Sequence, residues 1–137
     1  MIRTAAVCAA ASICAGAVLL LTGCGSSSSA GGCKDVPLGT NNEVSSSLGT
    51  GFAVDDFKAV KSSNDVWFVS AKATGPSGEV TYPIWITKNF GGGPVYLGDH
   101  DSSNVTPGLK KISGVSMSDD AVQKAKDCSR KAAEEGS

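Results

Sequence analysis

The most regular pattern of apolar and polar positions lies between residues 66 and 87. Residues 66–74 read Val-Trp-Phe-Val-Ser-Ala-Lys-Ala-Thr, and such a run of β-branched and aromatic side chains is typical of a strand. The sequence Gly-Pro-Ser-Gly at 75–78 favours a tight turn. Residues 79–87 then resume an alternation of apolar and polar side chains. The pattern predicts a β-hairpin.

Shorter signals on either side of the hairpin predict the rest of the fold. Phe57–Val60, Val95–Leu97 and Leu109–Val115 have the composition of short strands. Residues 34–51 are rich in glycine, asparagine and serine and predict a loop with at most one short strand or turn. Near the C-terminus, small side chains recur at the spacing of one helical face: Ala121, Ala125, Cys128 and Ala132. We therefore predict an α+β fold, in which a small antiparallel sheet of three to five strands is packed by one C-terminal helix.

The two arms of the hairpin can be paired by counting outward from the turn. Placing Thr74 opposite Glu79 makes one face wholly apolar, and the buried face of a strand sets its register. On the other face, this register places Phe68 opposite Trp85, an aromatic pair that needs a cover. Either residues 34–60 or the last helix cover the pair, or both rings are exposed and form a surface for a partner. Pro83 lacks an N–H donor, so its strand is expected to be an edge or to carry a bulge.

A different pattern occupies the N-terminus, where Arg3 is followed by an apolar run from Ala5 to Leu21. A positive charge, an apolar stretch and a small-residue cleavage site are the parts of an export signal. Residues 21–24, Leu-Thr-Gly-Cys, resemble the lipobox of bacterial lipoproteins. The resemblance implies that the chain is cut before Cys24 and that the Cys24 sulfur carries a diacylglycerol, with or without an N-linked acyl chain. The alternatives are an uncleaved anchor and an ordinary secretory signal cut elsewhere.

This signal divides the chain into four expected parts. Residues 1–23 are the signal peptide, and residues 24–32, mostly glycine and serine, are a flexible lipidated tether. Residues 33–132 are a single globular domain, and residues 133–137 are a frayed tail. We expect the lipid to hold the domain at the cell membrane, on its extracytoplasmic face.

The positions of the cysteines predict one disulfide. Of five cysteines, Cys8 and Cys14 lie in the signal and Cys24 carries the lipid, which leaves Cys33 and Cys128. Exported proteins fold in a compartment that permits disulfides, so we expect these two residues to pair. The alternative is two unpaired or metal-binding thiols, but no third or fourth ligand stands near either one in the sequence. No cofactor or metal is expected.

Charge and polar composition limit the functions that can be considered. Without residues 1–23 the chain has 114 residues and a net charge of −2, which argues against a nucleic-acid partner because such partners need clustered cations. The most polar stretch, residues 99–104, places the only histidine, His100, between Asp99 and Asp101. It lacks the glycine and the glutamate of a calcium loop, and no recognisable nucleophile accompanies it. We interpret it as a solvated loop.

The globular part also resembles a group of small, functionally uncharacterised lipoproteins from actinobacteria and their phages. The resemblance is carried by residues 57–61, by residues 66–71 leading into 74–76, and by Ser-Met-Ser-Asp-Asp at 116–120 with Cys128 eight residues later. It implies a lipid-anchored α+β domain on the outer side of the cytoplasmic membrane. It assigns no catalytic or ligand-binding residue.

Three functions from different classes are compatible with these features. The sequence favours a non-catalytic binding or interaction module whose target is an envelope protein or a small ligand, with Phe68 and Trp85 as its candidate surface. The second is superinfection exclusion by a prophage-encoded lipoprotein, which neighbouring phage genes would support. The third is a small envelope enzyme that uses His100 with Asp99 or Asp101.

Overall fold

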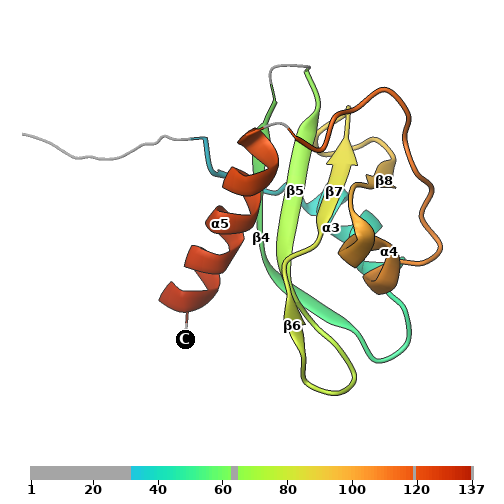
Figure 1. Cartoon of the computed structure of the whole chain (residues 1–137), viewed down its shortest axis with the longest axis vertical. Coiled ribbons are helices and arrows are strands. Elements are labelled where there is room, and N and C mark those ends of the chain that lie inside the picture. Colours follow the sequence, from blue (N-terminus) through green and yellow to red (C-terminus); the bar gives the residue numbers. More distant parts are fainter. Residues whose placement is uncertain (1–31, 63–64, 119, 137) are drawn as a thin grey trace, which may run out of the picture. The chain divides into compact units, whose positions relative to one another are not determined.

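The computed structural model describes residues 32–62, 65–118 and 120–136. A compact unit runs from Cys33 to Ser137. Its elements in chain order are β3 (Lys34–Asp35), α3 (Leu38–Ser45), β4 (Ala53–Lys61), β5 (Trp67–Thr74), β6 (Val80–Thr81), β7 (Ile84–Thr87), β8 (Val95–Leu97), α4 (His100–Val105) and α5 (Asp120–Glu135). The α+β prediction is confirmed, with an antiparallel sheet packed against the C-terminal helix (Figure 1).

The sheet has six strands in the order β3-β4-β5-β7-β8, with β6 paired to β5 beside this path. All of these strand pairs are antiparallel. The count exceeds the predicted three to five because the second arm of the hairpin is divided into β6 and β7. Pro83 lies in the gap between them, where a residue without an N–H cannot donate to the ladder. β7 itself is an inner strand between β5 and β8.

The hairpin register differs by one residue from the predicted one. Thr74 pairs with Val80 rather than with Glu79. The turn is a three-residue loop closed by Gly75, whose N–H donates to the Glu79 carbonyl at 2.8 Å, and Gly78 adopts a positive φ of 87°. Such a loop fits a turn followed by a left-handed glycine, and the loop length sets the pairing of the arms. Because side chains alternate along a strand, this one-residue shift exchanges the two faces of one arm relative to the other.

The shift places Phe68 and Trp85 on opposite faces of the sheet. Phe68 pairs with Ile86, and Trp85 pairs with Val69. Both rings are buried, at 1% and 0% exposure. The expected aromatic pair on one face is therefore wrong, and neither ring is available as a surface for a partner.

Two hydrophobic clusters cover the two faces of the sheet. One contains Phe68 and the buried side of α5, and Figure 1 shows α5 lying along β4 and β5. The helix can lie close to the strands because its buried residues are mostly small, namely Ala121, Val122, Ala125, Cys128, Ser129 and Ala133. The other cluster contains Trp85 with Val44 of α3 and Val105 of α4. The Trp85 ring is tied to this side by its Nε1–H, which donates to Thr106 Oγ1 at 2.8 Å.

Several segments are more ordered than the sequence suggested. Residues 34–51, expected to be a loop, form β3 and α3. The expected tail from residue 133 belongs to α5, which continues to Glu135 because Ala133 is buried against the domain.

One predicted strand is absent. Leu109–Val115 does not form a strand, and Lys111 makes only an isolated parallel bridge to Leu97.

One irregularity in β4 carries acidic residues. The pairing with β5 shifts between Asp55 and Lys58, and Asp56 there has a positive φ of 58°, as expected for a β-bulge. The pKa of Asp55 is raised, first by desolvation and then by its hydrogen bond to Asp56 and the repulsion between the two carboxylates.

Candidate functional site

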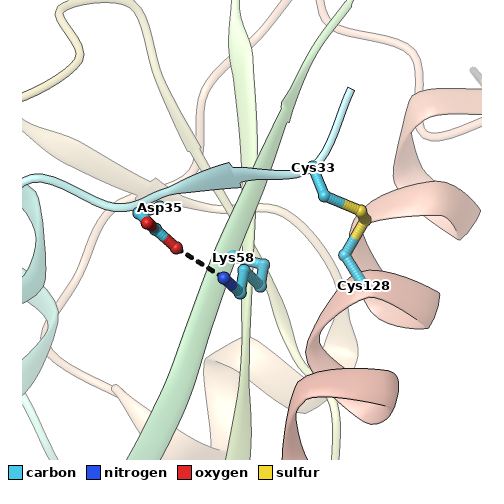
Figure 2. Close-up of a disulfide and its surroundings, with 4 residues drawn as sticks. All are labelled: Cys33, Asp35, Lys58 and Cys128. Carbon is cyan, nitrogen blue, oxygen red and sulfur yellow. Dashed lines mark hydrogen bonds and ion pairs between the residues drawn. A yellow bond between two sulfur atoms is a disulfide. The ribbon is translucent and has the colours of Figure 1, made fainter. Parts of the chain in front are cut away.

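The predicted lipid site at Cys24 lies outside the described residues, as do the signal peptide and the tether up to residue 31. The described chain thus starts next to Cys33, which forms a disulfide with Cys128 of α5 and confirms the predicted pairing. Figure 2 shows the bridge joining the chain just before β3 to α5. The two cysteines are 95 positions apart in the sequence. The bridge therefore fastens the first residue of the folded unit to its last helix.

An ion pair lies beside this bridge. The Lys58 ammonium donates to Asp35 Oδ1, so that β3 and β4 are linked by side chains as well as by their backbone (Figure 2). This hydrogen bond, followed by the lysine charge, lowers the pKa of Asp35. The Asp35 side chain is 90% exposed. A pair exposed to solvent in this way adds little stability.

A groove of about 340 Å³ lies elsewhere, at the β7–β8 end of the sheet. One wall is formed by the end of β8 and the start of α4, and the other by residues 111–117. The two walls are held together by the Leu97–Lys111 bridge and by the Leu97 N–H, which donates to the Lys110 carbonyl at 2.8 Å. The apolar part of the lining comes from Ile86, Leu97, Ile112, Val115 and Met117. The remainder of the lining is polar, so apolar and polar surface meet in the groove in about equal parts, and concave sites that combine the two are typical places for a ligand.

Asp99, at the polar end of the groove, has its carboxylate engaged in structural contacts. Its Oδ1 accepts the Ser102 N–H at 2.9 Å as the N-cap of α4, and also the Ile84 N–H at 3.1 Å. Its Oδ2 lies 3.2 Å from the Lys126 ammonium of α5. The carboxylate thus joins α4, β7 and α5, and its negative charge is balanced within the fold.

His100 and Lys111 are the two basic side chains that line the groove. Within residues 32–62, 65–118 and 120–136, neither the imidazole nor the ammonium makes a hydrogen bond or ion pair. Ser103, also in the lining, donates its hydroxyl to the His100 carbonyl at 2.7 Å. The polar end of the groove is therefore positively charged on balance, with Lys111 as its unpaired cation.

The residues singled out from the sequence are only partly brought together. Asp99 and His100 lie at the groove, in a short capped helix rather than in the expected solvated loop. Asp101 lines a separate, smaller cavity of about 90 Å³ together with Glu79. Phe68 and Trp85 line neither cavity. The sequence analysis did not identify Lys111 or the apolar side chains after it as part of a site. The spaced apolar residues of 112–117 were the only feature of the sequence that could have indicated this wall.

Gly98 positions the groove because the chain passes very close to β7 there. A Cβ at this position would lie 2.6 Å from the Ile84 carbonyl oxygen, which accepts the Gly98 N–H at 2.9 Å. We expect Gly98→Ala to lower the free energy of unfolding by about 1–3 kcal/mol, since backbone must move to admit the methyl group. Urea unfolding measures this loss. Gly108→Ala is the matched control, because no atom lies within 4 Å of a Cβ at that position. An equal effect of the two variants would contradict the close approach.

Neither a metal-binding cluster nor a membrane-spanning helix is present among the described residues. Among them, no three histidine, cysteine or acidic side chains are grouped so as to hold a metal ion. No helix in the described part of the chain combines the length and the apolar character needed to cross a membrane.

Comparison of the chain with protein-family models, with curated proteins and with solved structures found no match.

Proposed function

We propose that this protein is a lipid-anchored binding module on the extracytoplasmic face of a bacterial cell membrane. The groove beside α4 is the observation that carries the binding role. It joins an apolar wall to two basic side chains that have no partner in the described part of the fold. The role is proposed as non-catalytic because neither acid adjacent to His100 is placed to act with it in the groove. Asp99 is committed to Ser102, Ile84 and Lys126, and Asp101 lines the separate smaller cavity. The target is an envelope protein or a small ligand.

The anchoring part of the proposal rests on the N-terminal sequence. The lipobox at residues 21–24 is followed by a short run of glycine and serine, and the folded unit starts at Cys33. The sequence predicts a flexible tether for the eight residues between Cys24 and Cys33, and a tether of that length is expected to have a root-mean-square reach of about 15 Å. Two acyl chains on Cys24 are enough for stable membrane attachment, whereas one is not. The module would then work close to the membrane surface.

Mass spectrometry of the intact protein from a bacterial envelope tests the anchor. We expect the mature chain to start at Cys24 and to carry a diacylglyceryl group, with one disulfide between Cys33 and Cys128. The Cys24→Ser variant is the control, and it should remain uncleaved and without lipid. A wild-type chain cut at another residue, or carrying no lipid, would contradict the anchor.

Site-specific crosslinking in the same envelope tests the binding role. A photoreactive amino acid at position 115 lies in the groove wall, whereas one at Lys124 lies on the exposed side of α5. We expect position 115 to give a discrete adduct, protein or small molecule, that position 124 does not give. Identical adduct patterns from the two positions would count against the groove as the binding site.

A further inference from the structure

The side chains of the groove indicate which kind of molecule it fits. We infer that the groove binds an amphiphile with one anionic head group and an aliphatic body. This inference rests on the binding role proposed above and specifies its ligand.

The aliphatic part of the ligand is matched by the wall that follows Lys111. Ile112, Val115 and Met117 are only partly buried, and they pack at the edge of the cluster that contains Phe68. Figure 1 shows that α5 lies along β4 and β5. Ile112, Val115 and Met117 instead line the groove together with Ile86 of β7. A ligand chain that lies against these side chains would remove their apolar surface from water, which is favourable.

The charges of the groove indicate which head group the ligand carries. In the part of the chain that the structure describes, Lys111 is a cation without a partner, and the His100 imidazole, which also lines the groove, can donate a hydrogen bond. The one carboxylate of the lining, Asp99, is already neutralised by Lys126 at 3.2 Å. A cationic head group would therefore meet Lys111 without a compensating acid, whereas a single carboxylate or phosphate would satisfy it. Like charges brought together in this way are a strong element of selection between ligands.

The size of the groove favours a small ligand. Its volume of about 340 Å³ is near the lower end of the 300–1,000 Å³ that is usual for small-molecule sites. Octanoate, with one carboxylate and an unbranched chain, is a suitable probe. Octylammonium and 1-octanol are matched probes that keep the chain and change only the head group.

Met117 provides a reporter inside the groove. The chain contains two methionines, Met1 and Met117, and Met1 belongs to the proposed signal peptide. The lipidated protein is labelled with ¹³C-methyl methionine and placed in nanodiscs of a neutral phospholipid. We expect one methyl signal, which shifts saturably with octanoate, more weakly with 1-octanol and least with octylammonium. Removing methylenes from the carboxylate probe should weaken binding by about fourfold each.

The variants separate the charge of Lys111 from a general effect of positive charge. Lys111→Gln is expected to weaken octanoate binding by about tenfold and to leave 1-octanol binding unchanged. Lys110→Gln is the control, because Lys110 is exposed and does not line the groove. A second methyl signal from an uncleaved Met1 would contradict the proposed anchor without bearing on the ligand.

The remaining outcomes decide the ligand class and its source. Binding of octylammonium as tight as that of octanoate would overturn the inference, as would the absence of a saturable shift with octanoate. A shift of the Met117 signal when phosphatidylglycerol replaces the neutral lipid, without octanoate, would support it and identify the bilayer as the source. A shift with octanoate alone would support it with a free carboxylic acid as the ligand.

Discussion

Replacing Trp85 with alanine is expected to lower the free energy of unfolding by about 3–5 kcal/mol, the usual cost of truncating a buried aromatic side chain. Trp85 is the largest of the fully buried side chains, with 0% exposure. Its ring packs with Phe57 at a centroid distance of 6.4 Å, and its Nε1–H donates to Thr106 Oγ1. A loss of this size is a large share of the 5–15 kcal/mol that is typical of a folded domain. Urea unfolding followed by circular dichroism measures it.

Two variants make the Trp85 result specific. Trp85→Phe keeps most of the apolar volume and removes the N–H, and Thr106 Oγ1 can still donate to the Ser102 carbonyl at 2.7 Å. We therefore expect a smaller loss, about 1–2 kcal/mol. Trp67 stacks on Phe90 at 4.1 Å but is only partly buried, so Trp67→Ala should cost less than Trp85→Ala. An unfolding midpoint of Trp85→Ala equal to that of the wild type would show that the ring is not core, and would restore it as a candidate surface.

The hairpin shows how far a local pattern determines the sheet. The strands at 67–74 and 84–87 and the turn between them follow from β-branched and aromatic residues and from Gly75 and Gly78. The pairing register of these two strands cannot be predicted from the same residues, because all four residues of β7 are buried. A strand that is apolar on both faces satisfies either of two registers one residue apart, so alternation cannot choose between them. The turn geometry makes that choice here.

The groove depends on contacts that no local pattern contains. Residues 97–103 and 111–117 are brought together by the backbone pairing of Leu97 with Lys110 and Lys111. The short helix α4 lies in the polar stretch that the sequence predicts to be a solvated loop, and its capping box has Ser102 where the usual sequence signal is a glutamate or glutamine. The cysteine pairing was predictable for a different reason, since the predicted signal peptide and lipid site account for three of the five cysteines and leave Cys33 and Cys128. The disulfide could be predicted by counting cysteines, whereas the groove could not be predicted without knowing which segments lie close together in the fold.

Removing the disulfide with the double substitution Cys33→Ala and Cys128→Ala is expected to lower the free energy of unfolding by about 2–5 kcal/mol. The bridge closes a loop over a sequence separation of 95, for which the loss of chain entropy in the unfolded state corresponds to about 4–5 kcal/mol. Alanine is chosen because Cys128 is 9% exposed and packs in the cluster with Phe68, where a hydroxyl would be poorly placed. Urea unfolding of the variant and of the wild type gives the difference.

A reductant supplies the control for the disulfide. It should destabilise the wild type to about the level of the double variant and should leave the double variant unchanged. Destabilisation of the double variant by the same reductant, or a wild type that does not respond, would contradict a stabilising bridge.

The local effect of the disulfide is expected to be larger at β3 than elsewhere. β3 pairs with β4 through two residue pairs only, and the Lys58–Asp35 ion pair that supports them is exposed to solvent. Without the bridge, the pairing of β3 has little else to maintain it, so we expect its amides to lose hydrogen-exchange protection before those of β5 and β7. In a chain tethered through Cys24, force from the membrane would reach the fold at Cys33 and pass through the bridge to α5. Uniform loss of protection across the sheet would instead assign the bridge to global stability alone.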